Sequence, residues 1–158
     1  LVLRLWRNGG RFARVPEVLL RWRDAPTRLS RSDPRYSLDA FRACKVHHLR
    51  RGPLGADEGE PGRPVVICGA GPVGKAMARA LQGAGTEVRA FFDLDPRKIG
   101  QTIHGAPVLG PEDVPAPSSG GDGPVVLGAV GQPGARDEIR ALFGGVGWRE
   151  GEDLWMVA

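Results

Sequence analysis

From residue 64 onward, short apolar runs alternate with segments in which apolar residues recur every three or four positions. Runs of this kind, bounded by glycine, proline or charged residues, indicate buried strands; they lie at 65–68, 87–93, 125–131 and 153–158. The helical spacing predicts helices over 73–84 and 135–143, and 97–114 is expected to be irregular with a short strand near Val108. Strands that alternate with helices predict a doubly wound parallel sheet with helices on both faces.

The first 51 residues show a weaker and more mixed pattern. Apolar and basic residues at helical spacing predict a helix over 1–8, and 12–24 reads as two short strands separated by a proline. A loop is expected at 25–36, followed by a second helix over 37–51 with Ser37 as its N-cap. This part is therefore expected to be a short mixed α/β segment.

Residues 52–63 contain glycine, proline and acidic residues with no apolar period, which is typical of a linker. We therefore expect three regions: a first part at 1–51, a linker at 52–63, and a domain at 64–158.

The sequence GAGPVG at 69–74 lies directly between the first strand and the first helix of that domain. Gly69 permits a tight turn, Gly71 lets backbone N–H groups approach a pyrophosphate, and Gly74 lets the helix lie close to the sheet. A helix N-terminus also favours an anion, because it carries a partial positive charge and unpaired N–H groups. The turn predicts a nucleotide-binding site; a turn that only packs helix on sheet is the alternative.

Asp93 ends the second expected strand, 19 residues after Gly74, where an acidic residue accepts hydrogen bonds from a ribose diol. Its charge disfavours a 2′-phosphate, an effect that Arg97 and Lys98 would soften. A nucleotide-sugar also offers a ribose and a pyrophosphate, so NAD(P) and a uridine-diphosphate sugar both remain open as the ligand.

A second glycine-rich turn, 128–134, follows the third strong strand. In doubly wound sheets, ligands bind beyond the carboxyl ends of the strands near the reversal of strand order. This turn would form the other wall of that crevice, or would be an ordinary connection between strand and helix. The residues expected to bind the nucleotide are Gly69, Ala70, Gly71, Pro72, Val73, Gly74, Asp93, Leu94, Gly128 and Val130.

Charge is unevenly distributed along the chain, whose formal net charge is +4. Residues 1–64 contain 14 Lys and Arg and 7 Asp and Glu. Residues 65–158 contain 8 Lys and Arg and 11 Asp and Glu. The basic first part suits an anionic partner or a solvated arginine-rich surface. We expect a nucleotide-type small molecule as the partner, with a homodimer possible and no nucleic acid.

Several classes of protein are disfavoured by the composition. No apolar run reaches the roughly 18 residues of a membrane span, and no signal peptide is visible. The two cysteines, Cys44 and Cys68, lie in dissimilar contexts, so we expect no disulfide framework and a cytoplasmic location. The chain begins with Leu1 within a helical pattern, so we expect it to be a piece of a longer protein.

Candidate catalytic and metal-binding residues are few. His104 is the only histidine after residue 64, and that part has no tyrosine, so a self-sufficient dehydrogenase is not expected. Cys44, His47 and His48 share a helix face at a spacing compatible with zinc, but no further ligand is evident. We therefore expect neither a catalytic residue nor a metal site in this chain.

Residues 1–50 resemble the C-terminal end of bacterial family 2 glycosyltransferases of the GT-A fold. The matching positions are Leu3, Arg4, Leu5, Gly10, Pro16, Leu19, Leu20, Arg21, Arg23 and Ser30. In that family the metal-binding D-x-D and the acidic catalytic pair would lie before Leu1. The resemblance thus implies that this part supplies at most Arg21, Arg23, Arg28 or Ser30 near a nucleotide-sugar phosphate.

Residues 64–114 are similar to the N-terminal Rossmann-like domain of bacterial sugar acyltransferases and of nucleotide-sugar dehydratases. The matching positions are Gly69, Gly71, Gly74, Phe92, Asp93, Asp95, Pro96, Gly100, Ile103, Gly105, Pro107, Val108 and Gly110. In the acyltransferases this domain binds the nucleotide-sugar. Leu94 departs from the family's frequent Asp, and GPVGK replaces GGHGK, so the neighbourhood of the family's catalytic histidine is not carried over.

Together, these observations predict the C-terminal piece of a bacterial glycosyltransferase that ends in a Rossmann-like nucleotide-binding module. Its role would be binding or regulation and not bond-making. An NAD(P)-binding domain of an oxidoreductase and a structural dimerisation module are the alternatives.

Overall fold

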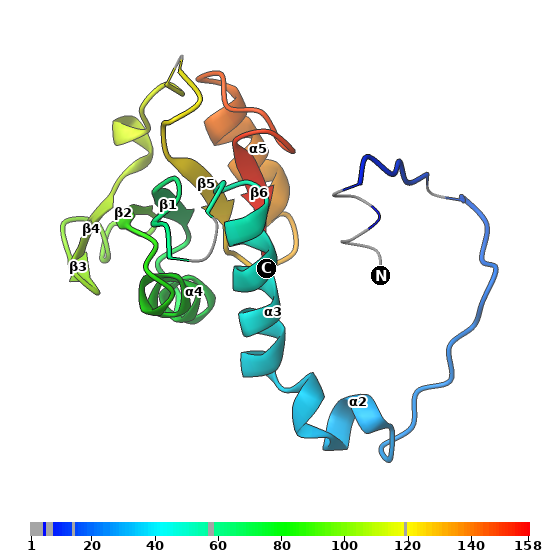
Figure 1. The fold of residues 1–158 in the computed structure, drawn as a ribbon. Helices are drawn as coiled ribbons and strands as arrows, with labels where there is room; N and C mark the ends of the chain where they lie inside the picture. The colour runs from blue at the N-terminus through cyan, green and yellow to red at the C-terminus, as the bar shows by residue number, and fades with distance from the viewer. Residues whose placement is uncertain (1–4, 6–7, 14, 57–58, 119) are drawn as a thin grey trace. The chain divides into compact units, whose positions relative to one another are not determined.

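The computed structural model describes residues 5, 8–13, 15–56, 59–118 and 120–158 (Figure 1). The chain divides into two units, Leu1–Cys44 and Lys45–Ala158. The helix α3 (Leu38–Arg51) contributes residues to both. None of the described helices is long and apolar enough to cross a membrane.

The second unit is built on a six-stranded sheet with the order β3-β4-β2-β1-β5-β6. All neighbouring strands pair in parallel except β3 and β4, which are antiparallel. The strands are β1 (Val65–Cys68), β2 (Val88–Phe92), β3 (Thr102–Ile103), β4 (Ala106–Leu109), β5 (Val125–Gly128) and β6 (Leu154–Met156). These bounds confirm each of the expected strands to within a few residues.

The five parallel strands reverse their order between β1 and β5. The chain runs outward from β1 through β2 to β4, then returns to the other side of β1 to form β5 and β6. This is the order of a doubly wound, Rossmann-like sheet, in which ligands bind at the reversal. In the register, Cys68 lies beside both Phe92 and Gly128, so the carboxyl ends of β1, β2 and β5 meet at one edge. The expected fold class is confirmed.

Helices cover both faces of this sheet (Figure 1). On one face, α4 (Pro72–Gly83) buries Met77 and Leu81 against the strands. On the other, α5 (Ala135–Gly144) buries Ile139 and Phe143. Both helices follow the sequence-based bounds within one residue, because an amphipathic stripe and a flanking glycine are local signals.

The segment 52–63, whose composition predicts a linker, contains core residues. Leu54 and Ala56 are buried, and the Leu54 N–H donates to the carbonyl oxygen of Leu49 in α3. Val46 and Leu49 of α3 join the same core cluster as Leu54. The division between the two units accordingly falls within α3 and not in 52–63.

Residues 1–44 differ from expectation in two places. The prediction of two strands in 12–24 was wrong, since no strand pairing involves these residues in the described part of the chain. A strand requires a neighbour to satisfy its backbone N–H and C=O groups. The loop expected at 25–36 contains α2 (Leu29–Ser32) and the 3-10 helix η1 (Pro34–Tyr36). Most of the helix expected at 1–8 lies outside the described residues.

The helix expected at 37–51 is confirmed as α3. Ser37 caps it as predicted, because its hydroxyl oxygen accepts a hydrogen bond from the Ala40 N–H at 3.1 Å.

Candidate functional site

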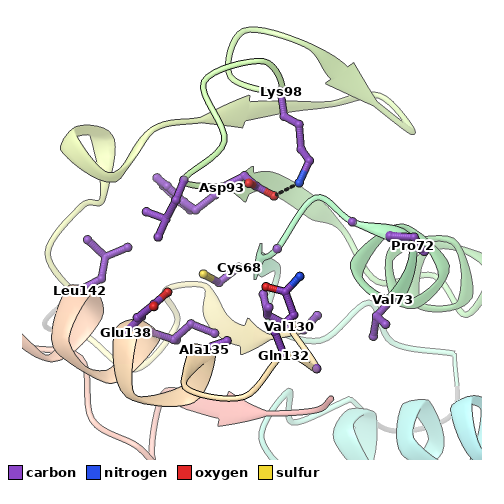
Figure 2. Close-up of a pocket in the computed structure, with 17 residues that line it drawn as sticks. Cys68, Pro72, Val73, Asp93, Lys98, Val130, Gln132, Ala135, Glu138 and Leu142 are labelled. Atoms are coloured by element: carbon purple, nitrogen blue, oxygen red, sulfur yellow. Dashed lines mark hydrogen bonds and ion pairs between the residues drawn. The ribbon is translucent and has the colours of Figure 1, made fainter.

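A cavity of about 510 Å³ opens at the carboxyl ends of β1, β2 and β5, where the strand order reverses (Figure 2). Its walls come from the turn after β1, the residues after β2, the turn after β5, and one side of α5. The volume lies within the range of about 300–1,000 Å³ that is usual for small-molecule sites.

The three glycines of the 69–74 turn differ in what surrounds them. Gly69 has φ +109°, and a Cβ there would lie 2.5 Å from Val130 Cγ2. A Cβ on Gly74 would overlap the carbonyl oxygen of Gly69. Gly71 has an ordinary φ of −84°, and no atom beyond its two chain neighbours lies within 4 Å of its Cβ position. Protein packing thus requires Gly69 and Gly74, whereas the space beside Gly71 is left open along the cavity wall.

The N-terminus of α4 brings backbone donors to this open space. The first helical hydrogen bond runs from the Lys75 N–H to the Gly71 carbonyl oxygen at 2.9 Å. The N–H groups before Lys75 have no acceptor within the helix. Pro72 has no N–H, so Gly71, Val73 and Gly74 are the donors at this end. These donors and the helix dipole favour an anion beside Gly71.

Asp93 lines the cavity and holds the turn in place. Its Oδ2 accepts hydrogen bonds from the Ala70 N–H at 2.8 Å and from Lys98 Nζ at 3.0 Å, and its Oδ1 accepts from the Asp95 N–H at 2.9 Å. Burial alone would raise the pKa of Asp93. These three hydrogen bonds and the charge of Lys98 outweigh burial and hold the pKa below its ordinary value. The carboxylate is therefore ionised, with three of its roughly four acceptor positions used.

The two basic residues near Asp93 have different roles. Arg97 makes two hydrogen bonds of 3.0 Å to the Asp95 carboxylate and does not line the cavity. Lys98 does line it, and Figure 2 shows its ammonium group reaching Asp93. Of the two, Lys98 is the one placed to influence binding of a 2′-phosphate.

Cys68, the last residue of β1, presents a buried thiol at the base of the cavity. Burial, together with the negative charge of Asp93, raises the pKa of this thiol to about 12. The group therefore remains protonated at neutral pH and is a poor nucleophile.

The structure places seven of the ten expected site residues on the cavity wall: Gly69, Gly71, Pro72, Val73, Asp93, Leu94 and Val130. The other three have different positions. Ala70 is buried and donates its N–H to Asp93. Gly74 packs against Gly69, and Gly128 lies inside the sheet, where a Cβ would come within 2.6 Å of Met156 Sδ.

The far wall of the cavity comes from α5, which the sequence analysis did not include in the site. Ala135, Glu138, Ile139 and Leu142 line it from this helix, as Figure 2 shows for the three that it labels. Ala135, Ile139 and Leu142 form the apolar stripe that predicts the helix. The same stripe could have indicated that α5 belongs to the site, because the apolar face of a helix that follows a strand also borders the crevice at the strand's carboxyl end.

No group of three or more His, Cys, Asp or Glu side chains could hold a metal ion among the described residues. The cavity instead combines backbone donors, one ion pair between Asp93 and Lys98, the Glu138 carboxylate and an apolar surface. This combination is suited to an amphipathic anion.

Neither a protein-family model nor a curated protein matches the chain. Solved structures similar to it include RSP, a Rex-family repressor, at 19% identity and a TM-score of 0.42, over 60% of this chain and 52% of that chain. RSP in complex with beta-NADH matches at 18% identity and a TM-score of 0.41, over 61% of this chain and 53% of that chain. RSP in complex with beta-NAD+ and operator DNA matches at 17% identity and a TM-score of 0.40, over 60% of this chain and 49% of that chain.

The chain spans about half the length of each of these structures.

Proposed function

We propose that residues 64–158 bind a nucleotide through its diphosphate at the N-terminus of α4. The observation that carries this proposal is the open space beside Gly71, at the strand-order reversal and next to three backbone donors. Backbone N–H groups at a helix N-terminus recognise phosphate oxygens without a basic side chain. Gly71 leaves these donors accessible, because a Cβ would project into the space the phosphate needs.

The ribose next to the diphosphate lies beside Asp93. With Ala70, Lys98 and Asp95 already donating to it, the carboxylate has one acceptor position for a ribose hydroxyl. A second hydroxyl would compete with Lys98 for Oδ2. NAD and a nucleotide-sugar both satisfy these contacts, and both are included in the proposal.

The role of the module is binding or regulation. Histidine is not among the residues that line the cavity, and the thiol there remains protonated. The competing function is that of a structural module, in which the turn packs α4 on the sheet and binds nothing.

A ligand titration of the whole chain tests the proposal. NAD, NADP and uridine-diphosphate sugars are added in a thermal-unfolding assay and then in calorimetry. A ligand at 100 times its dissociation constant stabilises the folded state by about 2.7 kcal/mol, which raises Tm by roughly 10 °C for a unit of this size. If no diphosphate ligand shifts Tm and calorimetry detects no heat, the proposal is wrong and the structural function replaces it.

We further propose that this module is carried by a bacterial glycosyltransferase. Only the resemblance of residues 1–50 supports this context. The coding sequence upstream of Leu1 tests it: a D-x-D and an acidic pair are expected there, and their absence from an extended reading frame would remove the proposal.

A further inference from the structure

Part of the cavity is left unused by the proposed diphosphate and ribose contacts. It lies between the end of β2 and α5, where Phe92, Leu94, Ile139 and Leu142 line it with apolar surface. In a nucleotide the base is attached to the ribose away from the 5′-phosphate. A diphosphate at α4 and a ribose at Asp93 therefore direct the base into this apolar part, where a flat ring gains apolar contacts.

Glu138 is the polar side chain that α5 contributes to this part. Figure 2 shows its carboxylate projecting from α5 into the space that faces Asp93. The neighbouring Asp137 is paired with Arg140 at 2.7 Å, and Arg140 also pairs with Glu150 at 2.7 Å. Within the described residues, the Glu138 backbone N–H donates to the Gly134 carbonyl oxygen at 3.2 Å, but no hydrogen bond or ion pair involves its side chain, so the carboxylate is available to a ligand.

We infer that Glu138 selects the base, by accepting a hydrogen bond from an amino group on its edge. This rests on the proposed function and specifies the ligand class of the same site. An ionised carboxylate accepts hydrogen bonds and donates none. Adenine and cytosine carry an exocyclic amino donor at the position where uracil and thymine carry a carbonyl oxygen, which a carboxylate repels. The site thus takes a nucleotide with an amino-bearing base and disfavours uridine and thymidine diphosphates.

The sharpest test compares CDP with UDP, because the two ligands differ only in the edge that Glu138 would contact. Calorimetry on the whole chain is expected to show CDP binding about ten-fold tighter than UDP. This corresponds to the lower end of the roughly 1.5–3 kcal/mol of a hydrogen bond to a charged group. ADP, measured in parallel, is expected to share the preference over UDP.

Two variants separate base selection from a general effect of charge. Glu138→Gln presents an amide that both donates and accepts, so the ratio of CDP to UDP affinity is expected to fall to within about two-fold. Asp137→Asn removes the same charge from the adjacent position, outside this cavity, and is expected to leave the ratio unchanged. Loss of one negative charge strengthens the binding of both diphosphates, and the ratio is insensitive to that effect.

The outcomes distinguish the two proposals. Equal binding of CDP and UDP by the unaltered chain, or an unchanged ratio in Glu138→Gln, would overturn the inference while diphosphate binding stands. If CDP, UDP and ADP all fail to bind, and NAD, NADP and the uridine-diphosphate sugars fail as well, the proposed function itself fails, and the selection of a base fails with it.

Discussion

Gly71→Ala is expected to weaken nucleotide binding at least ten-fold while leaving the folded unit intact. The new Cβ contacts no protein atom within 4 Å, and φ at this position is −84°, which alanine adopts without strain. Alanine is a poorer N-cap than glycine by about 0.5–1 kcal/mol. The lower entropy of the unfolded alanine chain offsets this by about 0.4–1 kcal/mol. The free energy of unfolding should therefore change by less than about 1 kcal/mol.

The loss in affinity follows from the position of that Cβ. In the proposed site the phosphate approaches the backbone at Gly71, so a Cβ there would hold a phosphate oxygen away from the N–H groups at the start of α4. Losing one or two charge-assisted hydrogen bonds, each worth about 1.5–3 kcal/mol, weakens binding by roughly ten-fold to more than ten-thousand-fold. Calorimetry with the ligand found in the titration measures this loss directly.

Two other glycines provide matched controls on the same helix. A Cβ on Gly83, in the last turn of α4, also meets no atom within 4 Å, so Gly83→Ala is expected to retain both stability and affinity. Gly74→Ala places its Cβ on the Gly69 carbonyl oxygen, so it is expected to lose more than about 3 kcal/mol of stability. If Gly71→Ala binds the nucleotide as tightly as the unaltered chain, the phosphate does not lie at this turn.

Three further predictions follow from the described contacts. Asp93→Asn is expected to lower stability at pH 7. Because the pKa of Asp93 is lowered in the folded state, the ionised carboxylate stabilises the fold above the ordinary carboxyl pKa of about 3.9, and this effect is lost as the pH falls through the folded pKa. Denaturant titrations at several pH values should therefore show the difference in free energy of unfolding between variant and unaltered chain shrinking at low pH. A difference that stays constant with pH would contradict this. A thiol reagent at pH 8 should modify exposed Cys44 rapidly and Cys68 only after unfolding, since burial raises the pKa of Cys68 to about 12. Fast modification of both cysteines in the native state would show that the base of the cavity is accessible to the reagent. Leu54→Ala is expected to lower the free energy of unfolding by about 2–5 kcal/mol in a denaturant titration, because Leu54 is fully buried. Leu38 is exposed, so Leu38→Ala should lower it by less than about 0.5 kcal/mol. Equal losses would mean that 52–63 is a true linker.

Strands β1 and β5 were the most predictable because they are buried on both faces. Such strands appear as short continuous apolar runs, which sequence reasoning detects easily. The clearest error of bounds is at β5, expected to extend to 131 but ending at Gly128. Ala129 and Val130 continue the apolar run past the strand because they line the cavity and contact Gly69. Apolar character there reflects the site and not the sheet.

Long-range contacts explain what sequence reasoning missed. The turn at 69–74 is contiguous, so its role could be inferred from spacing alone. Glu138 and Leu142 lie more than 60 residues later, and only the parallel register of β1 and β5 brings α5 against the turn. Leu54 illustrates the same limit, because a single apolar residue among glycines and prolines shows no period. Its burial depends on α3 and β1, which the composition of 52–63 does not reveal.

The glycine pattern itself contains two kinds of information that the sequence does not separate. Gly69 and Gly74 are required by the fold, since any side chain at either position meets protein atoms. A turn that only packed α4 on the sheet would need both, so their presence is equally compatible with binding and with packing. Gly71 is different: packing and backbone conformation both allow a side chain there. Its advantage over alanine as an N-cap is at most about 1 kcal/mol. The functional inference therefore depends on this one position, where a ligand that approaches the backbone gives glycine its further reason.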